Sequence, residues 1–155
     1  QASQYGGFLL CTSKTEISMI VDKSWKKIWK LRFENPLSDA ETLIINENGF
    51  VKELGNKTNS YENIQGQYIG LIKVDKTKLL DMVNFYDKLK NENLNNINQF
   101  ENMYMTSFLQ KLINDCWKVK PVFVDNGWLE FDSLKDLDLY NFLYKENKLK
   151  QFVSL

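Results

Sequence analysis

The 155-residue chain contains no histidine, and this absence excludes several kinds of catalytic site. Without imidazole, the chain has no Ser-His-Asp or Cys-His arrangement and no histidine-based metal site. A proton shuttle near neutral pH would need a carboxylate, a lysine or a cysteine with a shifted pKa. Chemistry must therefore come from carboxylates, cationic side chains, hydroxyls and aromatic rings.

An excess of charge of one sign is also lacking, because 20 Lys+Arg balance 20 Asp+Glu. This balance argues against a general nucleic-acid binder, which carries a basic excess. No apolar run approaches the ~20 residues needed to cross a bilayer. Residues 1–7 are polar and uncharged, unlike a signal peptide. The sequence indicates a single cytoplasmic domain that contacts neither nucleic acid nor membrane.

Cysteine is scarce, and the two cysteines, Cys11 and Cys116, lie far apart without CxxC spacing. A reduced domain without a disulfide is the simpler interpretation. A single disulfide between the two is the alternative.

Apolar periodicity predicts an α/β fold with an incomplete parallel core. Strands are expected at 17–21, 43–45, 50–54, 67–74 and 119–124, with a hairpin turn at Asn46 to Gly49. Pro121 suggests that the last of these strands lies at an edge or contains a bulge. Residues 25–33 are open to a helical or an irregular interpretation. Residues 1–14 and the asparagine-rich 91–98 are expected to be loops.

Three helical stripes are expected in the second half of the chain. The first follows Asp75 as N-cap, the second covers 105–116, and the third follows a capping box, Ser133-x-x-Asp136. The predicted inward residues of the first are Leu79, Met82, Val83, Tyr86 and Leu89, and those of the third are Leu137, Tyr140, Leu143 and Tyr144.

Glu130 and Asp132 are the first candidate site, and we expect them on a short strand. Alternate strand residues point the same way, so the two carboxylates would converge on one hard cation such as Mg²⁺. In the alternative interpretation they are solvated charges that flank a core Phe131 and favour the N-terminus of the last helix.

Weaker candidates lie earlier in the chain. Trp25 and Trp29 share a helical face if 25–33 is helical, either for core packing or to hold a quaternary ammonium by cation–π attraction. Arg32 suits a phosphate. Gly66 and Gly70 flank Gln67 and Tyr68 in a strand and indicate either a close approach of a ligand or a bulge. Lys57, taken alone, is a solvated charge.

Four segments carry a more specific signal when they are read in order. Residues 25–41, 64–73, 100–106 and 127–133 together resemble the C-terminal part of phosphocholine-cytidylyltransferase-like nucleotidyltransferases, relatives of the sugar-1-phosphate nucleotidyltransferases. The resemblance runs from about Glu16 to Tyr144. It implies part of a Rossmann-like domain, a mixed sheet with flanking helices.

The resemblance also implies an activity. Such an enzyme condenses CTP or another nucleoside triphosphate with phosphocholine or a similar phosphorylated amine or amino acid, releases pyrophosphate and depends on Mg²⁺. Its setting would be cell-surface polysaccharide biosynthesis in the cytoplasm. The alternative is a catalytically inactive small-phosphate-binding or oligomerisation module.

By position, the resemblance assigns roles to individual residues. Glu130 matches the family's metal-ligating acidic residue, and Asp132 assists it. Lys57 and Arg32 are the catalytic cations that bind the acceptor phosphate. The implied acceptor-binding residues are Trp25, Trp29, Asp39, Glu41, Gln67, Tyr68 and Trp128.

Two departures from the family pattern accompany the resemblance. Ser107 stands where an aspartate is expected after Tyr104-Met105-Thr106. The family's glycine-rich phosphate loop is not found, so we expect the N-terminal nucleotide-binding part to be absent. The 155 residues would then form one side of an active site, without activity alone and with an open sheet edge that favours a homodimer.

Overall fold

A computed structural model describes residue 10 and residues 12–153 of the chain. Cys11 and most of the expected N-terminal loop lie outside the described residues. Cys116 is an exposed free thiol. Within the described part, no helix has the length and apolar character required to span a membrane.

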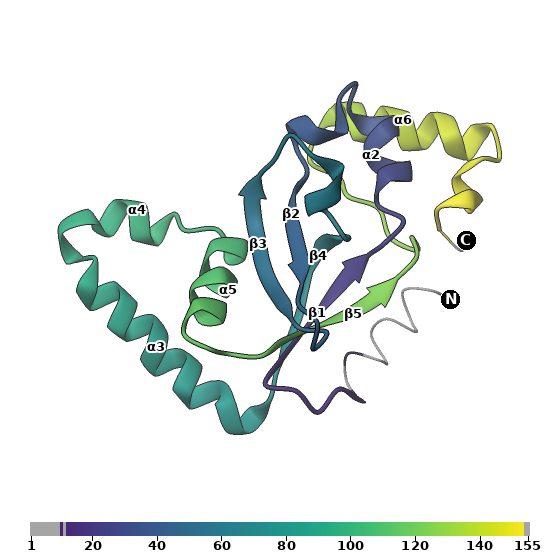
Figure 1. The fold of residues 1–155 in the computed structure, drawn as a ribbon. Helices are drawn as coiled ribbons and strands as arrows, with labels where there is room; N and C mark the ends of the chain where they lie inside the picture. The colour runs from purple at the N-terminus through teal and green to yellow at the C-terminus, as the bar shows by residue number, and fades with distance from the viewer. Residues whose placement is uncertain (1–9, 11, 154–155) are drawn as a thin grey trace.

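The central sheet has the order β4-β1-β5 and is mixed, as predicted. β1 (Ile17–Asp22) pairs antiparallel with β4 (Gln67–Val74) and parallel with β5 (Val119–Val124) (Figure 1). All six residues of β1 are buried, which suits its position between two strands. Pro121 lies in β5, an edge strand of the described sheet, where its missing N–H leaves no ladder bond unmade.

The predicted hairpin is confirmed and forms a second, two-stranded sheet. β2 (Glu41–Ile45) pairs antiparallel with β3 (Val51–Lys57). In the turn, Oδ1 of Asn46 accepts hydrogen bonds from the backbone N–H groups of Asn48 and Phe50. Gly49 has a φ of 77°, a left-handed conformation that glycine adopts without strain.

Helices gather at two sides of these sheets (Figure 1). α3 (Leu79–Glu92), α4 (Ile97–Glu101) and α5 (Met105–Asn114) lie on one side. α2 (Lys26–Arg32) and α6 (Leu134–Lys145) lie together at the other. Short 3₁₀ helices occur at Pro36–Ser38, Tyr61–Asn63, Lys76–Lys78, Leu94–Asn96 and Leu149–Gln151.

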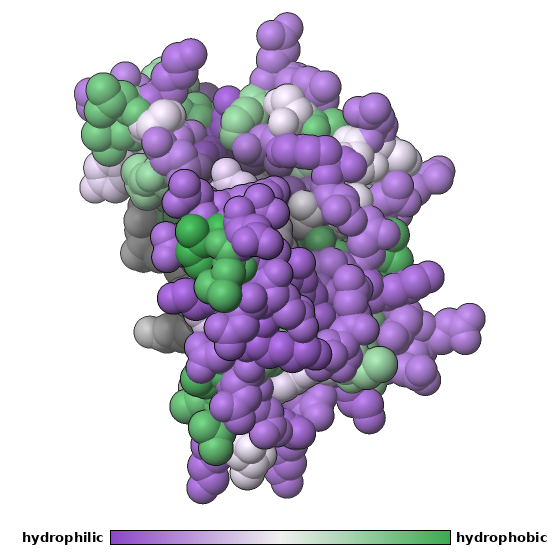
Figure 2. All heavy atoms as spheres, turned by 90° about the vertical axis from the view of Figure 1, so that its left-hand side faces the viewer, coloured by the Kyte–Doolittle hydropathy of each residue, from purple (hydrophilic) through white to green (hydrophobic). Residues whose placement is uncertain are grey.

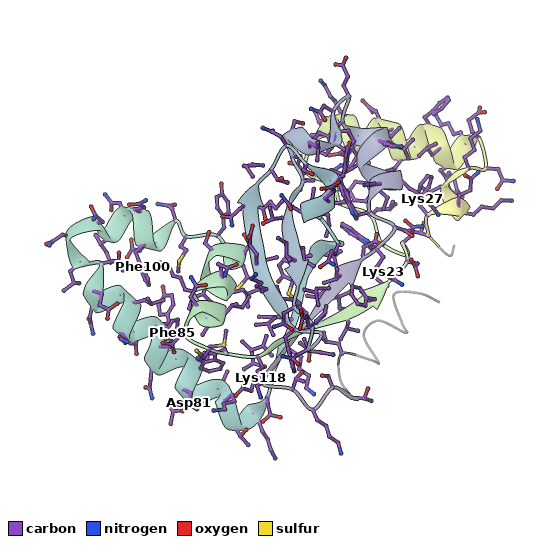
Figure 3. All side chains as sticks on the ribbon, in the orientation of Figure 1. Lys23, Lys27, Asp81, Phe85, Phe100 and Lys118 are labelled. Atoms are coloured by element: carbon purple, nitrogen blue, oxygen red, sulfur yellow. The ribbon has the colours of Figure 1, made fainter. Side chains whose placement is uncertain are left out.

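The main core lies between the sheets and α5. It contains one face of β1, side chains of the hairpin, and the buried stripe of α5, formed by Phe108, Leu109 and Leu112. Aromatic rings of α3 and α4 extend this core: Phe85 packs on Phe108 and Tyr86 packs on Phe100, with centroids 6.3 and 5.0 Å apart (Figure 3). A second cluster, Trp25, Ile28, Trp29, Ala40 and Ile64, fixes α2 against the start of the hairpin.

Two predicted helical stripes were only partly right. In α3, Met82 packs against the main core and Leu89 belongs to it, but Leu79 and Val83 are exposed and Phe85 packs inward instead. The residues that face the core are spaced as Met82, Phe85 and Leu89, and Asp75 caps the 3₁₀ turn at Lys76–Lys78 that precedes α3, accepting from Thr77. In α6, Tyr140 and Leu143 are buried, whereas Leu137 and Tyr144 are exposed.

Three further expectations differ from the structure. The asparagine-rich 91–98 is not a loop, because it contains the end of α3, a 3₁₀ turn and the start of α4. The helix expected over 105–116 stops at Asn114, and Cys116 follows it with a φ of 67°. No strand forms around Glu130 and Asp132, because no neighbouring strand offers a ladder to this segment.

The face that carries α3 and α4 is mainly hydrophilic, with apolar atoms only in small separate groups (Figure 2). The exposed Leu79, Leu80 and Val83 of α3 are therefore not evidence of an extended apolar surface.

Candidate active site

Arg32, the last residue of α2, is the centre of an ion-pair cluster near the start of α6. Its side chain is only 2% exposed. Nη1 lies 2.5 Å from Oε2 of Glu130, Nη2 lies 2.5 Å from Oδ2 of Asp132, and Nε lies 2.7 Å from Oδ1 of Asp136. Glu130 and Asp132 do converge on one cation, and in this structure that cation is a guanidinium.

The cluster shifts the ionisation of its members. Burial acts to lower the pKa of Arg32, but hydrogen bonds to Asp136, Asp132 and Glu130 raise it well above the ordinary value. The bond from Arg32 lowers the pKa of Asp136 from 3.8 to about 2. Burial raises the pKa of Glu130, although Arg32 opposes that effect. Three acidic side chains thus surround one guanidinium.

The segment before Glu130 is held by side chains in place of a ladder. Asp22, at the end of β1, is fully buried. Its Oδ1 accepts from the backbone N–H groups of Ser24 and Asn126, and its Oδ2 accepts from Nε1 of Trp128 at 2.9 Å. Gly127, with a φ of 89°, donates its N–H to the carbonyl of Phe152. These bonds direct the irregular chain past Arg32.

The two tryptophans of the aromatic segment are buried. Trp25 and Trp29 are 2% and 4% exposed and pack edge to face at 5.7 Å. Trp128 lies against Trp29 with ring centroids 6.0 Å apart. Nε1 of Trp29 donates to Oδ2 of Asp39 at 3.0 Å. Of the two interpretations left open by the sequence, core packing is the one that this arrangement displays.

Asp39, Glu41 and Lys57 form a second polar group beside the first. Glu41 and Lys57 are partners across the β2–β3 ladder. The exposed Lys57 donates from Nζ to the carbonyl of Asp39 at 3.1 Å. Burial raises the pKa of Glu41, while Lys57 and a hydrogen bond with the side chain of Thr106 act to lower it. Glu41 is therefore half-buried between the hairpin and the start of α5.

Asp39 connects the two polar groups. Beside burial, which is the larger cause, the negative charge of Asp39 raises the pKa of both Glu41 and Glu130. Its side chain meets Trp29 and its carbonyl meets Lys57. Most candidates from the first half of the chain thus lie in one region with Glu130.

Gln67 and Tyr68 have mainly structural contacts. Nε2 of Gln67 donates to the carbonyl of Glu41 at 2.7 Å and Oε1 accepts its N–H at 3.2 Å. This pair of bonds joins β4 to β2 in the manner of a ladder. Tyr68 packs against the main core, and burial raises the pKa of its hydroxyl. Gln67 therefore holds the backbone of Glu41 in place.

Two residues of the site were not identified as such from the sequence. Asp136 was recognised only as a helix cap, and its contact with Arg32 has no local signal. Thr106 was noted only as part of the segment 100–106 that resembles the family, yet its side chain bonds to Glu41. It also lies so close to β3 that a Cβ at Gly55 would come within 2.8 Å of its own Cβ.

Glu130 and Asp132 suit a magnesium ion by their chemistry, because Mg²⁺ takes one or two carboxylates and keeps water or phosphate oxygens in its other positions. Each carboxylate uses one oxygen for Arg32. Among the described residues, no group of three acidic or cysteine side chains could hold a metal ion. Further ligands would have to come from water, phosphates or another part of a protein.

No family model matches the chain, but comparison with known proteins finds a similar sequence and a similar structure. Over 130 residues the chain is 47% identical to the CTP:phosphoglutamine cytidylyltransferase of Campylobacter jejuni, a match that covers 84% of the chain and 51% of that protein. The chain thus spans about half the length of the curated relative it matches.

A solved structure, that of the inositol-1-phosphate CTP transferase from T. maritima, aligns with 97% of the chain and 53% of its own, with a TM-score of 0.57 and 19% identity. This likeness confirms the expected fold class, an α/β arrangement that matches part of a nucleotidyltransferase. By its sequence match, the chain belongs to the sugar-phosphate and CTP nucleotidyltransferase family, and it spans about half of the relative that it matches.

Proposed function

We propose that the chain is the acceptor-binding, C-terminal part of a Mg²⁺-dependent cytidylyltransferase. The whole enzyme would join CTP to a small phosphorylated acceptor and release pyrophosphate. The observation that carries the proposal is that Lys57 donates to the carbonyl of Asp39 beside Glu41, and that the charge of Asp39 acts on both Glu41 and Glu130. The 47% identity to a cytidylyltransferase supports it.

The reaction needs positioning and charge neutralisation more than covalent chemistry. An acceptor phosphate oxygen attacks the α-phosphorus of CTP, a P–O bond forms, and the bond to pyrophosphate breaks. Lys57 would hold the acceptor phosphate, because its ammonium is exposed and needs to leave only a backbone carbonyl. Glu130 and Asp132 would hold Mg²⁺ through the oxygens that Arg32 does not use. The bound ion would neutralise charge on the phosphates.

Arg32 is held by carboxylates in this structure. Its predicted contact with the acceptor phosphate stays a prediction and would require its ion pairs to open. All three of its nitrogens already donate to carboxylates. Lys57 is therefore our preferred phosphate contact.

For the acceptor we propose a phosphorylated amino acid. Asp39 and Glu41 are carboxylates beside Lys57, which suits a molecule that carries both an ammonium and a phosphate. A quaternary ammonium would need open indole faces, and Trp25 and Trp29 are buried. The matched relative is named for phosphoglutamine, which agrees with this choice.

Calorimetry on the chain tests this proposal. Titration with a phosphorylated amino acid should show binding that Lys57→Ala weakens by about tenfold, as expected for loss of one charge-assisted contact. Lys30→Ala, on the exposed side of α2, is the matched control and should leave the affinity unchanged. Absence of acceptor binding by the wild-type chain would sink the proposal. Robust pyrophosphate release from CTP by the chain alone would contradict our expectation that a second part is needed.

A catalytically inactive binding module is the second candidate. It is favoured by the two-carboxylate donor set, which is incomplete for a metal within the described residues. Such a module would bind the acceptor with no dependence on Mg²⁺ or CTP.

A further inference from the structure

We infer that Asp136 is a positioning residue, which holds Arg32 as a brace between the two proposed metal-binding carboxylates, Glu130 and Asp132. This inference rests on the proposed function, because the brace has a purpose only if those carboxylates bind a cation. Asp136 itself would touch neither metal nor substrate.

Arg32 contacts only one oxygen of Glu130 and one of Asp132. Glu130 accepts from Arg32 through Oε2, and Asp132 accepts through Oδ2. The second oxygen of each, Oε1 of Glu130 and Oδ1 of Asp132, has no hydrogen bond or ion pair in the described part of the chain. The planar fork of a guanidinium thus orients both carboxylates and leaves one oxygen on each for a cation.

Asp136 holds Arg32 through both of its carboxylate oxygens. Its residue is 5% exposed, and its Oδ1 accepts from Nε of Arg32 at 2.7 Å. Its Oδ2 accepts from Nη2 of Arg32 and from the backbone N–H groups of Asp132 and Ser133. One carboxylate therefore fixes both the guanidinium and the backbone of a carboxylate that the guanidinium orients.

The positioning of Arg32 by Asp136 is distinct from helix capping. Ser133 and Asp136 form a capping box, for which any side-chain acceptor at Asp136 would suffice. Capping does not need the bidentate contact with Arg32, in which the charged carboxylate of Asp136 binds a residue of another helix, α2. Hydrogen bonds to metal-binding carboxylates commonly fix the orientation of those ligands.

Two variants separate the roles. Asp136→Asn keeps a cap acceptor of the same size but removes the negative charge that faces Arg32. Ser133→Ala removes the cap hydroxyl, which also donates to Oδ2 of Asp136 at 2.8 Å, and leaves the contact between Asp136 and Arg32. Binding of Mn²⁺, measured by electron paramagnetic resonance of the free ion, is the first readout. The second is the ¹⁵N NMR spectrum of the Arg32 side chain, which reports whether the guanidinium is rigid.

We expect Asp136→Asn to weaken Mn²⁺ binding by about tenfold or more, the usual effect of losing a partner of a metal ligand. The Arg32 signals of this variant should average by rotation. Ser133→Ala should change Mn²⁺ affinity by less than about twofold and should keep the rigid Arg32 signals, since the brace is intact.

The outcomes are distinct. If the wild-type chain and Asp136→Asn bind Mn²⁺ equally, the inference is wrong and the metal proposal stands. If Ser133→Ala weakens binding as much as Asp136→Asn, Asp136 acts only through the cap and the inference is again wrong. If the wild-type chain binds no Mn²⁺, the metal part of the proposed function and this inference are both wrong.

Discussion

The indole Nε1 of Trp128 donates a hydrogen bond to Oδ2 of Asp22, 106 positions earlier in the chain. Asp22 ends β1, and Trp128 lies two residues before Glu130. The bond therefore joins the central strand of the sheet to the segment that brings the acidic pair to Arg32. Asp22 is fully buried, so its carboxylate needs hydrogen-bond donors to offset the cost of its burial. Trp128 is one of these donors.

We expect Trp128→Phe to destabilise the chain, because one buried carboxylate oxygen loses its donor. The free energy of unfolding should fall by about 1–3 kcal/mol. Urea denaturation measures this loss, and Trp117→Phe is a matched control because the Trp117 indole N–H has no hydrogen bond within the described residues. Equal losses in the two variants would mean that the bond to Asp22 contributes nothing specific.

Replacing Arg32 should lower the free energy of unfolding by more than Trp128→Phe does. Arg32→Met leaves Glu130, Asp132 and Asp136 without the cation between them. Deleting one partner of a buried ion pair costs about 3–5 kcal/mol, because the remaining charge is left uncompensated. The measurement is again urea denaturation, with Lys30→Ala on the exposed side of α2 as control. A variant as stable as the wild type would show that the cluster contributes no net stability.

Asp136 should make the free energy of unfolding depend on pH in the acid range. Its pKa in the fold, about 2, is below the ordinary 3.8, so its ionised form favours the folded state. The contribution, about 2 kcal/mol, is fully present above about pH 5 and is lost as the pH falls through the folded pKa. Glu130 acts oppositely, because its raised pKa gives a contribution that is present at low pH and is lost as the pH rises.

Urea denaturation at several values between pH 6 and about pH 2 tests this dependence. The unfolding free energy of the wild type should fall over the acid range, and Asp136→Asn should lack much of that fall. The same acid dependence in both proteins would assign it to other carboxylates.

Local signals predicted local structure well. The hairpin turn at Asn46 to Gly49 and the capping box of Ser133 and Asp136 were both confirmed, because each depends on residues at most four positions apart. The α3 stripe was less successful, because Phe85 packs inward on Phe108 whereas Leu79 and Val83 are exposed. Apolar periodicity alone does not show which of several neighbouring apolar residues meets the core.

The candidate site depends on a contact between residues that are far apart in the sequence. Glu130 and Asp132 do face one cation, but no strand places them there, and the cation is Arg32, 98 positions away from Glu130. No local pattern connects residues so far apart. The contact arises from packing of α2 against α6, which only the three-dimensional arrangement reveals.

A pair of glycines in and beside β4 offers a last test, because they are needed for different reasons. A Cβ at Gly66 would lie 2.3 Å from Cγ1 of Val21 and 3.1 Å from the carbonyl oxygen of Asp22. Gly66→Ala should therefore lower the unfolding free energy by about 2–3 kcal/mol, the upper part of the range for overpacking.

At Gly70 a Cβ would meet nothing within 4 Å, but φ is +84°. Gly70→Ala should cost about 1 kcal/mol from backbone strain alone. Urea denaturation compares the two variants. A cost at Gly66 no greater than that at Gly70 would show that β1 moves freely away from β4, and the close approach would then be unimportant.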